Sequence, residues 1–123
     1  MFPIKIKRKA EKVFKYCIKK KIKMSFAESC TGGLLSALVT SFPNSSKIFI
    51  SGFITYSDLS KQNMIGVKSK TLKKYGAVSY EVAKEMVNGV WKKDKLNIAL
   101  SITGIAGPSG QTKKKKVGLV YIG

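Results

Sequence analysis

The sequence predicts a layered α/β fold whose sheet is at least partly parallel. Short apolar runs typical of strands alternate along the chain with segments of helical periodicity. The 123 residues are 44% hydrophobic, which is enough for one core in a single domain spanning 1–123. Pro and Gly are not in excess, so the composition excludes a disordered or fibrous protein.

Helical spacing and strand-like runs define the expected elements. Ser57 and Ser79 each precede a helical run, and we expect both to be N-caps. We expect Val13, Leu34 and Trp91 on buried helix faces. The expected helices cover 5–20, 32–42, 58–65, 71–74 and 80–91, and the expected strands cover 24–27, 48–56 with an interruption at Ser51-Gly52, 97–102 and 117–122.

The charge and residue usage exclude several function classes. The chain has 24 basic and 6 acidic residues, a formal charge of +18, but Arg8 is its single arginine. Nucleic-acid readers favour arginine, so we expect no specific nucleic-acid partner. The chain has no His, which excludes Ser-His-Asp, Cys-His and His-ligated metal chemistry within it. We expect Cys17 to be a buried core thiol and both it and Cys30 to be free.

The sequence also bears on location. The basic N-terminus lacks the apolar stretch and cleavage site of a signal peptide, and no apolar run could cross a bilayer. We therefore expect a cytoplasmic protein without a membrane partner.

Three turns follow predicted strands, at Ser29, at Tyr56-Ser57 and at Thr103-Gly104. Ligands of open α/β sheets bind beyond the carboxyl ends of the strands. We therefore expect these three turns to converge on a single site.

The first turn, Ser29 to Gly33, runs from a strand into a helix. Its glycines allow a sharp turn, and the free N–H groups of a helix start favour a phosphate or an oxyanion. Ser29 is the candidate nucleophile, and Thr31 is a candidate cap or ligand contact. Two alternatives stay open: Ser29 and Thr31 are only caps, or Cys30 is the nucleophile.

The second turn pairs Tyr56 with Lys61. With Ser57 as N-cap, these two residues occupy the positions that touch in a hydrophobic staple. A desolvated lysine can lose its charge and act as the base that a serine needs, with Tyr56 relaying or orienting the proton. The alternative is an exposed lysine whose stem packs over the Tyr56 ring.

The third turn opens a loop with Gly104, Gly107 and Gly110. It lacks the Gly-Lys-Ser/Thr ending of a phosphate loop and the Gly-x-Gly of a dinucleotide site. The hydroxyls of Thr103 and Thr112 could contact a ligand, and the loop amides could hold a phosphate. The alternative is a surface hairpin connection, with lysines 113–116 mostly solvated.

These segments together resemble the CinA C-terminal domain family, whose stand-alone members are nicotinamide-nucleotide amidases. Order and spacing agree through nearly the whole chain, although no single motif would suffice. The matching stretches are Ala27-Glu28-Ser29-Cys30-Thr31-Gly32-Gly33, Gly52-Phe53-Ile54-Thr55-Tyr56-Ser57 with Lys61, Gly76-Ala77-Val78-Ser79, Thr103-Gly104-Ile105-Ala106-Gly107-Pro108, and Val117-Gly118 with Tyr121.

The resemblance implies an α/β/α sandwich, a homo-oligomer, and hydrolysis of nicotinamide mononucleotide to nicotinate mononucleotide and ammonia. It implies Ser29 as nucleophile, activated by Lys61 and Tyr56, with no metal or cofactor. The small-molecule nucleotide, and the oxyanion that forms from its carboxamide during the reaction, are then expected to contact eight substrate-binding positions. These are Cys30, Thr31, Gly32, Gly33, Thr103, Gly104, Gly107 and Thr112.

The sequence departs from the family pattern in two places. Ser109, Gln111 and the lysines 113–116 interrupt a loop that is usually richer in Gly and Pro. Relatives are also expected to add a strand and a helix beyond Tyr121, which would leave an edge or an apolar face uncovered in this chain. The alternatives to an amidase are therefore a weak or inactive remnant that only binds nucleotides or polyanions, and a structural partner of a separate domain.

Overall fold

A four-stranded sheet lies at the centre of the computed structural model, which describes residues 2–123. The strands lie in the order β2-β1-β3-β4. β1 is parallel to both of its neighbours, and β4 is antiparallel to β3. The expectation of a mixed, partly parallel sheet is confirmed. The strands are β1 (Met24–Glu28), β2 (Phe49–Ile54), β3 (Ile98–Gly104) and β4 (Val120–Ile122).

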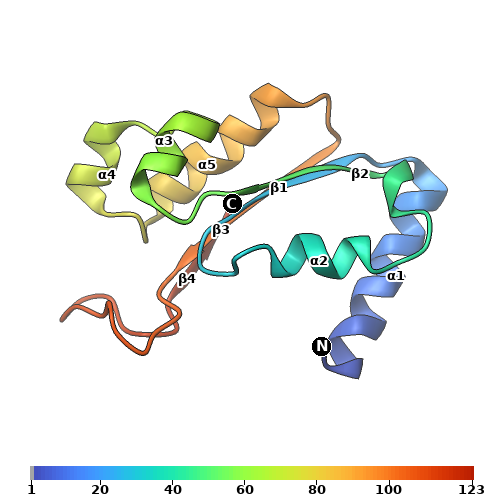
Figure 1. Cartoon of the computed structure of the whole chain (residues 1–123), viewed down its shortest axis with the longest axis horizontal. Coiled ribbons are helices and arrows are strands. Elements are labelled where there is room, and N and C mark those ends of the chain that lie inside the picture. Colours follow the sequence, from blue (N-terminus) through green and yellow to red (C-terminus); the bar gives the residue numbers. More distant parts are fainter. Residues whose placement is uncertain (1) are drawn as a thin grey trace.

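Helices cover both faces of this sheet and complete three layers (Figure 1). One face carries two helices and the other carries three, and a short 3-10 turn at Ser45–Lys47 leads into β2. The layered α/β/α architecture is therefore the one expected. The helices are α1 (Ile4–Lys20) and α2 (Leu34–Thr40) on the first face, and α3 (Asp58–Ile65), α4 (Ser69–Tyr75) and α5 (Tyr80–Lys93) on the second.

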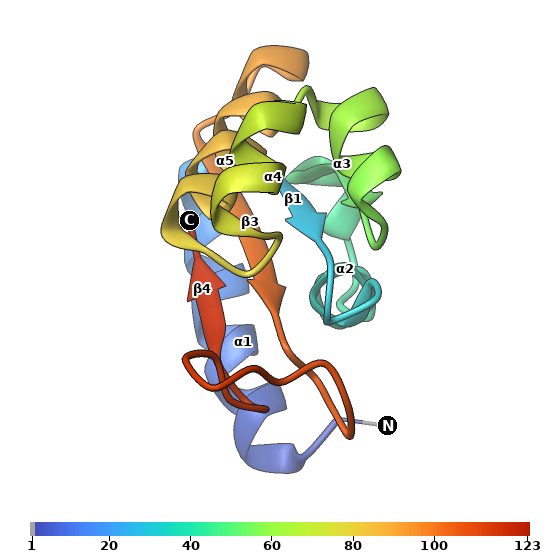
Figure 2. The same ribbon diagram turned by 90° about the vertical axis from the view of Figure 1, so that its left-hand side faces the viewer.

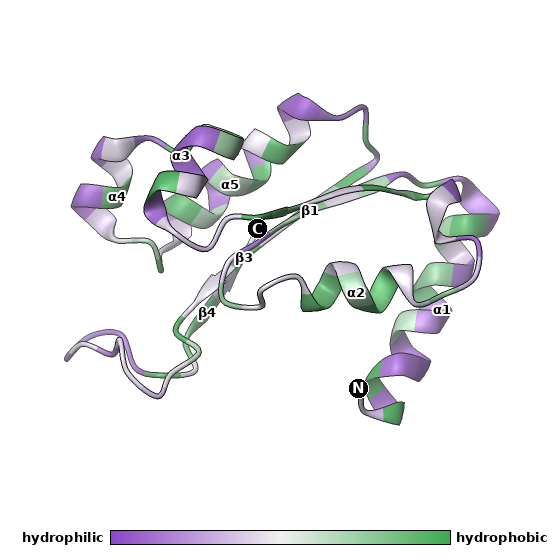
Figure 3. Cartoon of the chain, viewed as in Figure 1, coloured by the Kyte–Doolittle hydropathy of each residue, from purple (hydrophilic) through white to green (hydrophobic). Residues whose placement is uncertain are grey.

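Each layer boundary holds a hydrophobic core. Every residue of β1 is buried, because this strand lies between two others and under helices on both faces. Phe26 packs into the core beneath α1 and α2, and its neighbour Ala27 packs into the core beneath α3–α5. Figure 3 shows hydrophilic and hydrophobic residues together on α1, α3, α4 and α5, whereas α2 is hydrophobic to neutral along its length.

The predicted helix starts on the second face are confirmed. The Ser57 hydroxyl accepts a hydrogen bond from the Ser60 amide, and Asp58 occupies the first turn of α3. The Ser79 hydroxyl accepts one from the Val82 amide at the start of α5. These caps satisfy amides that would otherwise lack partners. Among the described residues, no helix is long and apolar enough to span a membrane.

Some local expectations are wrong. β2 continues through Ser51-Gly52, although its register with β1 shifts directly before Ser51: Met24 pairs with Phe49 and Ser25 with Ser51, so Ile50 is an extra residue. The Ser51 amide donates to the Ser25 hydroxyl at this irregularity. β4 is shorter than expected, since Gly118 at φ 91° breaks the extended backbone. The apolar faces are narrower than their sequence patterns indicate, so Val13, Leu34 and Trp91 are exposed.

The carboxyl ends of the parallel strands meet at one end of the molecule. Figure 2 shows β1 and β3 pointing to the same end of the sheet, and the loop that joins β3 to β4 extends beyond that end. The three turns singled out in the sequence all lie there.

Candidate functional site

Ser29 lies directly after β1, and the main chain holds it firmly. Its amide donates to the carbonyl of Ile102 on β3 (2.9 Å), and its carbonyl accepts from the amide of Gly32 (3.0 Å). Gly33 completes the turn at φ 99°, a conformation that residues with a side chain rarely adopt. The Ser29 hydroxyl is thus presented at the end of the central strand by a tight turn.

Glu28 shapes this turn, and its role was not anticipated from the sequence. Its carboxylate is fully buried and accepts from the Leu35 amide (3.0 Å) and from the Ser36 amide (2.8 Å) and hydroxyl (2.6 Å). Burial raises the pKa of Glu28, but these hydrogen bonds outweigh it and hold the pKa below its usual value. The start of α2, where an anion was expected to bind, is therefore occupied by the protein's own carboxylate. The Ala27-Glu28-Ser29 sequence contains the signal, since a carboxylate favours a nearby helix N-terminus.

Lys61 lies on α3 and is buried, with 1% of its surface exposed. Its amine lies 3.1 Å from the Ser29 hydroxyl oxygen. It also donates to the main-chain carbonyls of Thr55 (2.9 Å) and Tyr56 (3.0 Å). Lys61 is therefore not an exposed lysine whose stem packs over the Tyr56 ring, which was the alternative expectation.

The three contacts of the Lys61 amine suit a neutral base. A neutral amine has two N–H groups, which the two carbonyls can accept, and one lone pair, which can accept the Ser29 O–H. Burial lowers the pKa of Lys61, and the nearby Asp58 only partly offsets this. The geometry thus places a proton acceptor of reduced pKa against a serine hydroxyl.

Tyr56 meets Lys61 differently from the expected pairing. The contact is made by its main-chain carbonyl, while its side chain is largely exposed at the cavity mouth. The reason is that Tyr56 precedes the N-cap, so its carbonyl can turn toward the next helical turn while its ring points outward. In the structure, Tyr56 therefore contacts the Lys61 amine through its main chain and not through its hydroxyl.

A cavity of about 370 Å³ opens beside Ser29 and Lys61. All three predicted turns contribute to its wall, together with the segment between α4 and α5. The described residues that line it are Ser29, Cys30, Tyr56, Lys61, Ala77, Val78, Thr103, Gly104, Ile105, Ala106, Gly107, Ser109 and Gly110.

Only some of the predicted substrate-binding positions line the cavity. Cys30, Thr103, Gly104 and Gly107 line it, whereas Thr31, Gly32 and Gly33 form the turn behind Ser29 and Thr112 lies out in the exposed loop. The Thr103 hydroxyl donates to the Ala77 carbonyl (2.9 Å) and so joins two walls of the cavity. The Thr112 hydroxyl accepts from the Lys115 amide (3.0 Å).

Cys30 is half-buried beside Ser29, and both cysteines are free thiols, as expected. Burial raises the pKa of the Cys30 thiol, and hydrogen bonds from the amides of Cys30 and Thr31 offset this only in part. A protonated thiol is a poor nucleophile, which favours Ser29 over Cys30. Cys17 is buried in the first core, as expected.

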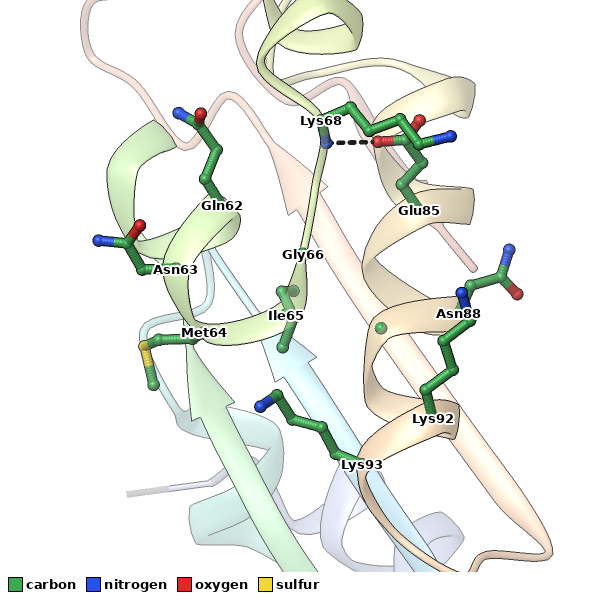
Figure 4. Close-up of a pocket in the computed structure, with 11 residues that line it drawn as sticks. Gln62, Asn63, Met64, Ile65, Gly66, Lys68, Glu85, Asn88, Lys92 and Lys93 are labelled. Carbon is green, nitrogen blue, oxygen red and sulfur yellow. Dashed lines mark hydrogen bonds between the residues drawn. The ribbon is translucent and has the colours of Figure 1, made fainter.

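A second cavity of about 400 Å³ lies on the outer side of α3 and α5 (Figure 4). It flanks the contact where Gly89 of α5 meets the Ile65 carbonyl of α3. Glu85 at its edge accepts from the Lys68 amide (2.8 Å). Ser29 and Lys61 do not line this cavity, so the chemistry described above belongs to the first one. Within residues 2–123, no group of three or more His, Cys, Asp or Glu side chains is arranged to hold a metal ion.

Comparisons with known proteins agree with this architecture. The model of the CinA C-terminal domain matches residues 6–123. A competence-damage inducible protein of Alkaliphilus oremlandii is 51% identical over 113 residues, which are 92% of this chain and 27% of that protein. A CinA-like protein of Endomicrobium trichonymphae is 57% identical over 100 residues, 81% of this chain and 23% of that protein. The chain thus spans about a quarter of the length of the curated relatives it matches.

Solved structures are similar over almost the whole chain. The competence/damage inducible protein CihA of Agrobacterium tumefaciens superposes with a TM-score of 0.96 at 38% identity, covering 99% of this chain and 74% of that one. The competence damage-inducible protein A of Klebsiella pneumoniae superposes with a TM-score of 0.90 at 30% identity, covering 94% and 72%.

Proposed function

Because the chain belongs to the CinA C-terminal domain family, we propose that it is a serine–lysine amidohydrolase acting on the carboxamide of nicotinamide mononucleotide. The observation that carries this proposal is the buried Lys61 amine, 3.1 Å from the Ser29 hydroxyl oxygen. In a chain without His, this pair supplies the nucleophile and base that amide hydrolysis needs.

In the proposed acylation step, Lys61 takes the Ser29 hydroxyl proton as the oxygen attacks the carboxamide carbon. The C–N bond then breaks, and Lys61 returns that proton to the departing nitrogen, which leaves as ammonia. The amides of Cys30 and Thr31, in the turn directly after Ser29, are the proposed donors to the oxyanion.

In the proposed deacylation step, a water molecule attacks the Ser29 ester while Lys61 takes a proton from it. Breaking the ester bond releases the acid, and Lys61 returns the proton to the Ser29 oxygen. The Thr55 and Tyr56 carbonyls hold the amine in place through both steps. The Tyr56 hydroxyl, at the cavity mouth, is the proposed contact to the substrate.

The experiment is ammonia release from nicotinamide mononucleotide by the purified protein. Ser29→Ala is expected to abolish release, whereas Cys30→Ala is expected to retain it within about threefold, because the Cys30 thiol stays protonated. Full activity in Ser29→Ala would remove Ser29 as nucleophile. A parent protein that releases no ammonia but binds the nucleotide would instead favour the binding-only alternative.

A further inference from the structure

A nucleotide substrate carries a phosphate group, and the cavity beside Ser29 offers it little positive charge. Of the described residues that line the cavity, Lys61 alone has an amine, and this amine is committed to Ser29 and two carbonyls. A phosphate with up to two negative charges is costly to desolvate without a cation or several donors. The described side chains that line the cavity therefore offer the phosphate no free cation, and any cationic partner must lie outside this lining.

Helix N-termini are the usual phosphate sites in such folds, and those of α2, α3 and α5 already have acceptors. At α2, the Glu28 carboxylate accepts from the first free amides. At α3 and α5, the hydroxyls of Ser57 and Ser79 accept from the amides of the first turn. Acidic residues also lie in the first turns of α3 and α5, which disfavours an anion there.

Lys115 does not line the cavity, but its amine lies beside the segment that leads into the cavity wall at Ala77. The amine of Lys115 donates to the Tyr75 carbonyl at the end of α4 (2.6 Å). The same amine lies 3.5 Å from the position that a Cβ on Gly76 would take, and the next residue, Ala77, lines the cavity. Lys115 is half-buried, so its position is defined by the fold.

The loop around Lys115 is also tied to the opposite wall. Thr112 and Lys115 close a turn through two hydrogen bonds, from the Thr112 amide to the Lys115 carbonyl (2.8 Å) and from the Lys115 amide to the Thr112 hydroxyl (3.0 Å). Two residues on, Val117 lies against Gly107, which lines the cavity. The loop therefore crosses the rim from one wall to the other.

We propose that the Lys115 amine binds the phosphate group of the substrate. The ammonium group has three N–H donors, of which the Tyr75 carbonyl takes one, so two remain for a phosphate oxygen. Lys113 and Lys114 are exposed in the same turn and add to the positive potential at this point. This inference rests on the proposed function, because it names how that site selects a phosphorylated substrate.

The test compares nicotinamide mononucleotide with nicotinamide riboside, which has the same carboxamide but no phosphate. Lys115→Gln is expected to raise the KM for the mononucleotide about tenfold, the effect of losing one charge-assisted contact. It should leave kcat, and the KM for the riboside, within about twofold. Lys115→Arg should restore the parent KM. Lys73→Gln, at an exposed lysine of α4, removes the same charge and should change neither substrate.

Two results would overturn the inference. Equal KM changes for both substrates in Lys115→Gln would mean that Lys115 only clamps the end of α4. Equal effects of Lys115→Gln and Lys73→Gln would mean that only net charge matters. If the parent hydrolyses neither substrate, the proposed function fails, and calorimetry with ribose 5-phosphate decides the site. If Lys115→Gln then leaves the Kd for ribose 5-phosphate unchanged, the phosphate-binding role of Lys115 is overturned. If the substitution weakens this binding about tenfold, the role is supported.

Discussion

Replacing Lys61 by Met separates the chemical role of the amine from its place in the core. Methionine nearly matches the lysine stem in size and is apolar, so it fits a position that is 1% exposed. The substitution removes the proposed base 3.1 Å from the Ser29 hydroxyl. General-base catalysis contributes about 10²- to 10⁴-fold. We therefore expect ammonia release to fall about 10³-fold, or about 4 kcal/mol in the barrier.

The stability change of Lys61→Met is expected to be small because two effects oppose each other. The Thr55 and Tyr56 carbonyls lose their donor, which costs about 1–3 kcal/mol for each buried acceptor left without a partner. In return, folding no longer has to desolvate an amine. The net change should stay below about 3 kcal/mol, so the variant should fold and its activity can be interpreted.

The pH dependence supplies an independent measurement. Burial lowers the pKa of Lys61, so the folded protein loses this proton at a lower pH than the unfolded chain, where the lysine pKa is about 10.4. Between the two pKa values the unfolded chain binds more protons, so the free energy of unfolding rises with pH. Activity should rise with pH through the lowered pKa, because the neutral amine is the base. Lys61→Met should lose both dependences.

The assay is ammonia release, combined with urea unfolding followed by circular dichroism between pH 6 and 10. Lys70→Met, at an exposed lysine of α4, makes the same chemical change on the surface and should behave like the parent. The reasoning is refuted if folded Lys61→Met keeps more than a tenth of the parent activity, or if it keeps the parent's rise of activity with pH.

Three further substitutions test the surroundings of the pair. Glu28→Gln should lower the free energy of unfolding at pH 7 by about 2 kcal/mol, because one amide at the start of α2 loses its acceptor. In urea unfolding, this difference from the parent should shrink as pH falls through the lowered pKa of Glu28, because the parent carboxylate then becomes protonated. Tyr56→Phe should lower kcat/KM about tenfold through one lost substrate hydrogen bond, yet leave the thermal midpoint unchanged, because the main-chain carbonyl still holds Lys61; a large drop in the midpoint would contradict this. Gly89→Ala should destabilise by about 3 kcal/mol or more despite the better helix propensity of Ala, because its Cβ would overlap the Ile65 carbonyl, and Asn88→Ala on the exposed face should change little.

Much of the fold could be predicted because local patterns encode it. The N-caps Ser57 and Ser79 form hydrogen bonds within three residues, so the sequence alone places the starts of α3 and α5. The failures arose where a distant contact decides the outcome. Helical spacing groups Val13, Leu34 and Trp91 with core residues, but how the helices pack decides which residues are covered, and these three are exposed.

For the candidate site, too, the local features could be predicted from the sequence and the contacts between distant residues could not. Ser29 and its glycines lie within five residues, so the tight turn after β1 is visible in the sequence. Glu28 escaped notice because its place before a helix start favours a carboxylate there but does not show that this carboxylate is buried. Its three hydrogen bonds become apparent only when α2 is placed seven to eight residues later.

The sequence by itself determined which chemistry was open to this protein. A chain without His must find its base elsewhere, and the alternation of strands and helices directs the turns at Ser29, Tyr56 and Thr103 to one end of a parallel sheet. The spacing after the Ser57 N-cap and the family resemblance pointed to Lys61, but only the tertiary structure shows that its amine is buried, has a lowered pKa and lies 3.1 Å from the Ser29 hydroxyl oxygen. A pKa responds to burial and to neighbours brought together from three elements, and side-chain spacing along one element does not contain that information.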